Sequence, residues 1–165
     1  MNKKNISINF EYDYDFLLIG ICSTFKDYSL GYHLNKTLET SLKRSKNDVI
    51  MSFQDGLEEA SFSQFEYWDK QFQNQWYMIA NTSTILCSNS NQNQGTIFDG
   101  YLQNIKKTKK LIPENANIDY FLQIHGIFNQ ESKITLLKSI KNLDRIQSAH
   151  VINITELKSK ENLII

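Results

Sequence analysis

The last third of this sequence shows a strand–helix–strand pattern, which restricts the possible folds more than any other feature. Residues 118–125 and 145–154 have the composition of strands, and Gly126 closes the first of them. Between them, residues 131–143 show a helical spacing of apolar side chains, with Ile134, Leu137 and Ile140 on one face. Two strands joined through one helix run in the same direction when they share a sheet. We therefore expect parallel strands here, either adjacent or separated by another strand.

The first third predicts two further strands and a second helix. Residues 6–12 are apolar at every second position, which is typical of a strand with one buried face, and residues 16–21 form a more apolar strand. Leucines recur every fourth residue over 30–42, which predicts a helix with one apolar stripe. Asp27 suits the start of this helix, and the basic pair at 43–44 suits its last turn, where cations favour the negative end of the dipole.

The middle of the chain is rich in aromatic residues and predicts a β-hairpin. Within 62–81, two alternating runs flank a polar connection, as expected for strands joined by a turn. A short strand is also expected at 49–53. The segment 88–95 contains no apolar residue and predicts a mobile polar surface loop. Residues 96–111 fit a helix by their spacing and, in part, an edge strand, so both remain open.

These elements together predict one α+β domain that covers residues 1–165. A chain of 165 residues has the usual size of a single domain, and a hydrophobic fraction of 41% is sufficient for a core. We expect a two-layer sandwich in which a mixed, mainly antiparallel sheet carries at least two packed helices.

Charge and cysteine content bear on the compartment. Lysine plus arginine equals aspartate plus glutamate, 18 each, so no net charge draws the chain to nucleic acid or to an anionic membrane. The longest apolar run, residues 16–22, is much shorter than the roughly 20 residues of a membrane-spanning helix. No signal-peptide pattern is present, and Cys22 and Cys87 do not form a disulfide framework. We expect a cytoplasmic protein without membrane contact.

One segment resembles a known family signature. Residues 112–120 read Ile-Pro-Glu-Asn-Ala-Asn-Ile-Asp-Tyr, which is similar to the signature of the bacterial IPExxxVDY family. The matching letters are Ile112, Pro113, Glu114, Asp119 and Tyr120, and an isoleucine stands in place of the valine. Segments at 18–21, 34–36, 42–44 and 158–163 extend the resemblance over nearly the full length. The resemblance implies a small cytoplasmic protein of a family without an established activity, and it brings no catalytic or ligand residues.

The residues of this segment have a structural and a functional interpretation. Pro113 restricts its predecessor to an extended conformation, and the polar side chains that follow suit a turn before a strand. Tyr120 suits a buried ring with a hydrogen-bonded hydroxyl. In the functional interpretation, Glu114, Asp119 and Tyr120 form a polar cluster beside a binding surface. Turn chemistry accounts for every position, so the structural interpretation is favoured.

Common catalytic patterns are missing from the sequence. The histidines are far apart, neither cysteine lies in a Cys-x-x-Cys pair, and we therefore expect no metal. There is no Gly-x-Ser-x-Gly motif, and the six glycines are scattered rather than gathered in a phosphate-binding loop. We expect no catalytic residue and no cofactor.

The favoured function is that of a non-catalytic interaction or regulatory protein that acts through a protein partner. Its candidate surface is the aromatic hairpin, because aromatic side chains make strong contacts at interfaces; the residues are Phe65, Tyr67, Trp68 and Trp76. One alternative is RNA contact through the basic runs 43–46 and 106–110, which requires both runs on one face. A second alternative is an enzyme of unrecognised type, with Glu114, Asp119 and Tyr120 in a deep pocket.

Overall fold

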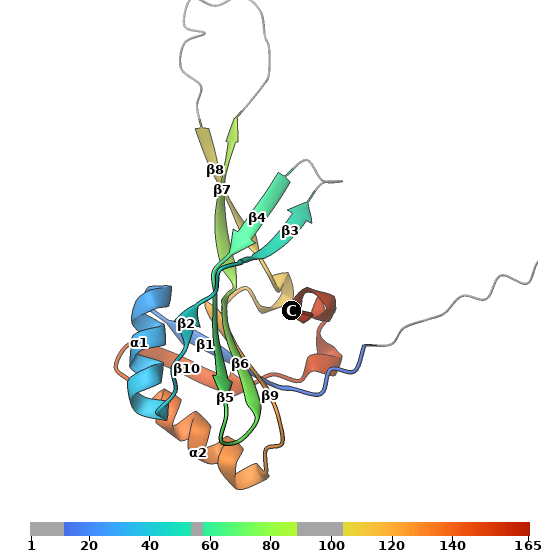
Figure 1. Ribbon diagram of the computed structural model, residues 1–165. Helices are drawn as coiled ribbons and strands as arrows, with labels where there is room; N and C mark the ends of the chain where they lie inside the picture. The colour runs from blue at the N-terminus through green and yellow to red at the C-terminus, as the bar shows by residue number, and fades with distance from the viewer. Residues whose placement is uncertain (1–11, 54–57, 89–103) are drawn as a thin grey trace, which may run out of the picture.

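The computed structural model describes residues 12–53, 58–88 and 104–165 (Figure 1). Its centre is a six-stranded sheet in the order β10–β1–β9–β6–β5–β2, in which every neighbouring pair is antiparallel. The strands are β1 (Leu17–Ser23), β2 (Lys43–Arg44), β5 (Gln64–Asp69), β6 (Asn74–Ala80), β9 (Tyr120–His125) and β10 (Ile146–Val151). The predicted α+β sandwich with a mainly antiparallel sheet is confirmed.

Two helices, α1 (Asp27–Leu38) and α2 (Gln130–Lys141), pack on one face of this sheet (Figure 1). Alternate side chains of the central strands meet them in one apolar core, which includes Ile19, Leu122, Met78, Leu30, Leu34, Leu136 and Ile140. Each helix has 12 residues. Within the described ranges, neither helix has the length and apolar character needed to cross a membrane.

On the opposite face of the sheet, side chains of two hairpins and of short helical turns form a second core. In Figure 1 the hairpins extend beyond the upper end of the sheet. The hairpins are β3 (Val49–Phe53) with β4 (Glu58–Phe62), and β7 (Thr82–Ser88) with β8 (Asn104–Lys110). The short turns are η1 (Pro113–Asn115), η2 (Ile154–Glu156) and η3 (Lys160–Leu163). This second core surrounds Leu18 and Phe121, so the central strands are buried on both faces. This explains why β1 and β9 are apolar runs rather than alternating ones.

The predicted strand–helix–strand pattern is present as β9–α2–β10. Both strands are antiparallel to β1, which lies between them, so they are parallel to each other without being adjacent. The hairpin predicted in the aromatic region is also confirmed as β5–β6, and the short strand at 49–53 is β3.

The predicted extent of the first helix is wrong at its C-terminal end. The helix stops at Leu38, and Glu39 adopts a left-handed conformation with φ of 54°. Leu42 is still buried, because the side-chain amide of Asn35 bonds both backbone groups of Leu42, at 2.7 and 2.9 Å. The chain then continues as β2, which pairs with β5. At the other end Asp27 is the first helical residue rather than the N-cap, and its carboxylate accepts a bond from the Tyr28 N–H.

Other expectations also need correction or lie outside the described residues. Of the predicted face of α2, Ile140 is buried and Leu137 packs against the core, but Ile134 is 44% exposed and Leu136 is buried in its place. The described part of the ambiguous segment 96–111 is strand β8. The predicted strand at 6–12, except its last residue, and the predicted mobile loop at 88–95, except its first residue, lie outside the described residues.

Candidate functional site

The segment with the family-like signature packs around one buried side chain, Asn81, which follows β6. Its Oδ1 accepts a bond from the Ile112 N–H at 2.8 Å, and its Nδ2 donates to the carbonyls of Asn115 at 3.0 Å and Ile118 at 2.9 Å. Its backbone N–H donates to the carbonyl of Asp119 at 2.8 Å. Asn81 is 0% exposed, so these contacts replace water for all the groups involved. Sequence analysis did not single out Asn81, since nothing local indicates its partners.

The three polar side chains of the signature contact three different segments. Glu114 accepts bonds from the Ser159 N–H at 2.7 Å and from the Ser159 hydroxyl at 3.0 Å. Asp119 accepts a bond from the Ser23 N–H at 2.8 Å. The Tyr120 hydroxyl donates to the carbonyl of Phe25 at 2.8 Å. Each contact joins distant parts of the chain, as in a structural role, and the three side chains do not converge on one cavity.

Two of these groups have shifted acidities that fit their surroundings. Burial, with smaller contributions from Asp27 and Asp119, raises the pKa of Tyr120 to about 12. Burial acts to raise the pKa of Glu114 as well, but the hydrogen bonds from Ser159 oppose it and the pKa lies below its usual value. Both groups therefore keep their usual charge near neutral pH, the tyrosine neutral and the glutamate ionised.

The aromatic hairpin is not the single surface that we expected. Phe65 and Trp76 are each 7% exposed and belong to the core beneath the helices, and Tyr67 packs against the same core. Trp68 is 46% exposed and lies on the opposite face, because successive strand residues point to opposite sides of a sheet. The alternation that predicted a hairpin also divides its aromatic side chains, which leaves only Trp68 of the four at the surface.

The basic run 106–110 on β8 contributes to the packing of the two hairpins. Lys107 and Lys109 place their Nζ atoms 2.6 and 2.7 Å from the carboxylate of Glu58 on β4. Lys109 also lies 4.6 Å from the ring centre of Phe53. Lys110 donates to the Thr82 hydroxyl at 2.7 Å. These contacts offset part of the positive charge that RNA contact requires.

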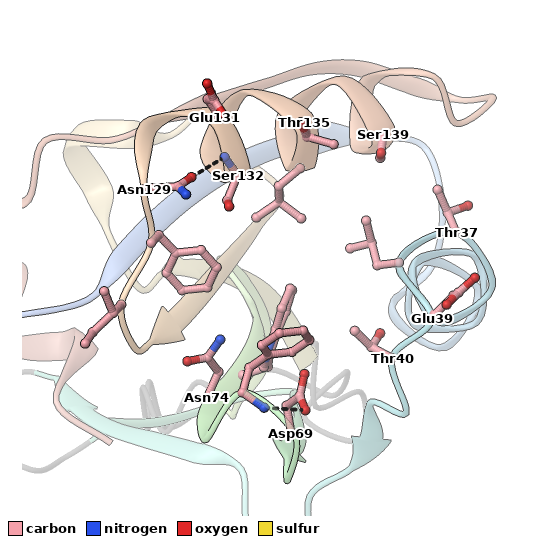
Figure 2. A pocket seen from close by; sticks show the side chains of 16 residues that line it. Thr37, Glu39, Thr40, Asp69, Asn74, Asn129, Glu131, Ser132, Thr135 and Ser139 are labelled. Atoms are coloured by element: carbon pink, nitrogen blue, oxygen red, sulfur yellow. Dashed lines mark hydrogen bonds between the residues drawn. The ribbon is translucent and has the colours of Figure 1, made fainter.

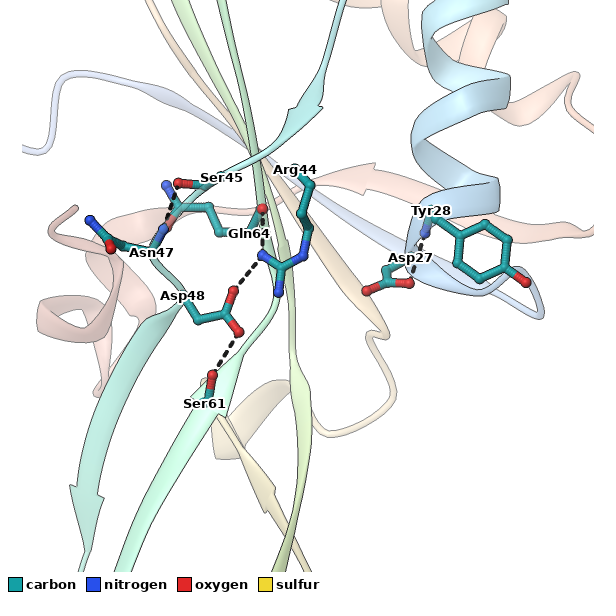
Figure 3. A network of polar contacts seen from close by, with 8 residues as sticks. All are labelled: Asp27, Tyr28, Arg44, Ser45, Asn47, Asp48, Ser61 and Gln64. Carbon is teal, nitrogen blue, oxygen red and sulfur yellow. Dashed lines mark hydrogen bonds and ion pairs between the residues drawn. The ribbon is translucent and has the colours of Figure 1, made fainter.

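The basic run 43–46 takes part in a second polar network (Figure 3). Arg44 forms an ion pair with Asp48 and donates to the Gln64 carbonyl at 2.9 Å. The Ser61 hydroxyl donates to the other oxygen of Asp48 at 2.7 Å. The hydrogen bond from Arg44 is the main reason why the pKa of Asp48 is lowered. The network joins β2 to the β3–β4 hairpin.

A cleft of about 640 Å³ opens between the C-terminal end of α1, the β5–β6 turn and α2 (Figure 2). Residues 37–40, at the end of α1 and directly after it, form one wall, and Asp69, Phe72, Asn74 and Trp76 line the cleft from the hairpin. The third wall consists of residues 127–129 and one side of α2. The cleft is thus formed by segments that are distant in sequence and meet only through the sheet order.

The polar lining of the cleft is acidic and rich in hydroxyl groups. Its charged residues are Glu39, Asp69 and Glu131, and no described lysine, arginine or histidine lines it. Figure 2 shows Glu39 at the edge of the cleft beside the end of α1, and Glu131 on the outer side of α2, pointing away from the cleft. Oδ1 of Asp69 accepts bonds from the N–H groups of Gln71 and Phe72, at 2.9 and 3.2 Å, and thereby shapes the turn. The hydroxyl groups belong to Thr37, Thr40, Ser132, Thr135 and Ser139.

Two apolar side chains of the cleft lining are largely exposed. Phe72 is 66% exposed and Ile127 is 99% exposed. Ile127 and Phe128 also line a neighbouring cleft of about 420 Å³ on the other side of their loop. The loop begins at Gly126, whose φ of 147° favours glycine, and a Cβ there lies only 1.8 Å from Oδ1 of Asn74. The position of Ile127 therefore depends on the close approach between the Gly126 backbone and the side chain of Asn74.

The described residues contain no group of three or more His, Cys, Asp or Glu side chains that could hold a metal ion.

Comparison with known proteins adds no family assignment, and the resemblance to the IPExxxVDY family remains a prediction. The sequence matches no protein-family model, no curated protein and no solved structure.

Proposed function

We propose that this chain is a non-catalytic interaction protein that binds a segment of a partner protein in the cleft between α1, the β5–β6 turn and α2. The observation that carries the proposal is the exposure of Phe72 and Ile127, at 66% and 99%, beside this cleft. The proposed setting is the bacterial cytoplasm, as the family resemblance implies.

Burial of these two side chains is a source of binding free energy. Complete burial of a side chain such as phenylalanine or isoleucine contributes about 1.5–3 kcal/mol. A few buried aromatic or aliphatic side chains commonly provide most of the affinity of an interface. The cleft has a volume of about 640 Å³, which is enough for a few side chains of a bound segment.

The composition of the lining supports binding rather than catalysis. Its serine and threonine hydroxyls have no lysine, histidine or cysteine beside them among the described lining residues. Activation of a hydroxyl nucleophile usually requires a base within hydrogen-bond reach, and none of the described hydroxyls of the lining bonds to Glu39, Asp69 or Glu131. The residues first considered for an enzyme, Glu114, Asp119 and Tyr120, bond to Ser159, Ser23 and Phe25 and do not line this cleft.

Affinity purification of the tagged full chain from its native cells tests the proposal. We expect the wild type to retain specific protein partners, and the double variant Phe72→Ser/Ile127→Ser to lose them. The matched control is Ile50→Ser, because Ile50 is 65% exposed on β3 and does not line the cleft. Thermal unfolding of all variants establishes that they are folded, since exposed substitutions usually change stability by only about 0.5 kcal/mol.

A nuclease-treated sample separates protein binding from RNA contact. Partners that persist after nuclease treatment and disappear in the double variant support the proposal. Partners that disappear with nuclease, or that depend on Ile50 rather than on Phe72 and Ile127, contradict it.

A further inference from the structure

We infer that the segment bound in this cleft carries a lysine or arginine next to an apolar residue. The inference rests on the proposed function and specifies the chemistry of its partner. Its basis is the combination of acidic groups, a helix C-terminus and exposed apolar side chains around the cleft.

The charge around the cleft differs from that of the whole molecule. The full chain has 18 basic and 18 acidic residues, whereas the cleft has three carboxylates and no described basic lining residue. Asp69 uses only Oδ1 to cap its turn, and no described group bonds to its Oδ2. That oxygen is available to a cation on a bound segment. Glu39 at the edge of the cleft, and Glu131 on the outer side of α2, add to the attraction during approach.

The end of α1 favours a cation as well. Residues 37–40 form the last turn of the helix and the residues after it, and they line the cleft. Carbonyl groups in the last turn of a helix lack partners within the helix, and this end of the dipole is negative. Lys36 also lies in this last turn but does not line the cleft. The start of α2 also lines the cleft, and the N-terminus of a helix favours an anion. This preference is weakened, because the Asn129 side chain accepts a bond from the Ser132 N–H at 2.8 Å and Glu131 lies in the first turn.

Trp76 provides an independent indication of a ligand. It lines the cleft and is 7% exposed, and its indole nitrogen has no hydrogen-bond partner among the described residues. A buried N–H without an acceptor is unfavourable. This nitrogen is enclosed, so a main-chain carbonyl of a bound peptide reaches it only after a small movement of the lining, and indole rings also attract cations. An apolar side chain of the segment then packs against Phe72 and Ile127.

Selection from a phage-displayed library of random heptapeptides tests the inference without knowledge of the natural partner. The full chain is the target, and the double variant Phe72→Ser/Ile127→Ser is used for counter-selection. We expect the enriched peptides to contain lysine or arginine beside an aromatic or aliphatic residue. We also expect their binding to weaken with added salt, because exposed charges are screened.

Charge variants then test the role of the three carboxylates. Asp69→Asn keeps an Oδ1 acceptor for the turn, and the triple variant Asp69→Asn/Glu39→Gln/Glu131→Gln removes the acidic charge from the cleft. The matched control Glu59→Gln/Glu66→Gln/Asp144→Asn removes three charges from exposed positions outside the cleft. Binding of an enriched peptide is followed by the fluorescence of Trp76 in a Trp68→Phe background. We expect about ten-fold weaker binding for the cleft variant and less than two-fold for the control.

The outcomes separate the inference from the proposed function. Enrichment of neutral or acidic peptides whose binding still depends on Phe72 and Ile127 overturns the inference and leaves the proposed function intact. Equal weakening in the cleft variant and the control also overturns it. If no enriched peptide depends on Phe72 and Ile127, both the inference and the proposed function fail.

Discussion

At the scale of single residues, Asn81 shows how one buried amide organises a whole segment. It satisfies one backbone N–H and two backbone carbonyls that are otherwise buried without water, those of Ile112, Asn115 and Ile118. The donor and acceptor of the amide are matched to these groups in a way that no apolar residue of similar size can reproduce. We therefore regard Asn81 as the main support of the signature segment.

Replacement of Asn81 by alanine should reduce the free energy of unfolding by about 3 kcal/mol or more, because several buried polar groups lose their partners. Urea unfolding monitored by circular dichroism measures the change. Asn142→Ala is the control, since Asn142 is exposed at the end of α2 and its side chain makes no cap contact. A loss below 1 kcal/mol for Asn81→Ala contradicts the assigned role.

His125 is a second residue whose contacts allow a prediction. Its ring lies against Phe16 and Tyr77, with ring centres 5.0 and 5.9 Å away, and its Nε2 is 2.8 Å from Nε2 of Gln123. An amide nitrogen only donates, so the imidazole accepts at Nε2 and is neutral in this arrangement. Burial lowers the pKa of His125, and Asp15 opposes this shift.

The stability of the protein should therefore fall on acidification in part because of His125. The pKa is lower in the folded state, so the unfolded state binds the proton more strongly between the two pKa values. The stabilising contribution of His125 is fully present above the histidine pKa of about 6.5 in the unfolded state, and it is lost as the pH falls through the lower pKa of His125 in the folded state. Urea unfolding at pH 7.5 and pH 5.5 should show a larger decrease for the wild type than for His125→Asn. Identical decreases in the two proteins refute the assignment, because the other histidines are common to both.

At the scale of elements, the loop between β9 and α2 determines the wall of the cleft. Gly126 directly follows β9 and has a φ of 147°, and the side chain of Asn74 from the neighbouring β6 occupies the space that a Cβ of residue 126 would take. The loop can then present Ile127 and Phe128 to the clefts on its two sides. The close contact between Gly126, after β9, and Asn74, at the start of β6, therefore determines where the proposed binding surface lies.

Gly126→Ala should destabilise the protein by about 1–3 kcal/mol, because it combines an unfavourable φ with a steric clash. Gly31→Ala is the matched control within α1. A Cβ at Gly31 lies 3.4 Å from the ring of Phe65, and alanine favours a helix by about 0.5–1 kcal/mol over glycine. Differential scanning fluorimetry should show a lower Tm for Gly126→Ala and little change for Gly31→Ala. Similar Tm values for the two variants argue against the close approach.

At the scale of the whole molecule, the C-terminal segment completes the second core. Leu157 and Leu163 are buried in it, and polar contacts hold the segment at three points. Ser159 donates to Glu114, Asn162 donates to the Leu111 carbonyl at 2.7 Å, and Gln123 donates to the Leu163 carbonyl at 3.2 Å. The end of the chain therefore joins η1, β9 and the residues after β8.

Leu163→Ala should cost about 2–5 kcal/mol, because Leu163 is 0% exposed and its truncation leaves a cavity. Ile165→Ala is the control, since Ile165 is 44% exposed only two positions later. Guanidinium unfolding of both variants measures the difference. A small effect at Leu163 indicates that the C-terminal segment is not part of the cooperative core.

Local patterns predicted the elements of this fold well where both partners of an interaction are close in sequence. The β5–β6 hairpin, strand β9 and helix α2 follow from alternation and helical spacing. The parallel direction of β9 and β10 follows from their connection through a single helix. Even there, the buried face of α2 was misjudged at Ile134, because the spacing of apolar residues does not identify which of them meets the sheet.

Tertiary structure alone decided the features that depend on distant partners. The end of α1 depends on the bonds between Asn35 and Leu42, and the burial of Trp76 depends on the helices above it. The cleft depends on three segments that meet through the strand order. A sequence pattern records the preferences of neighbouring residues, whereas these contacts are selected by the free energy of the complete packed arrangement.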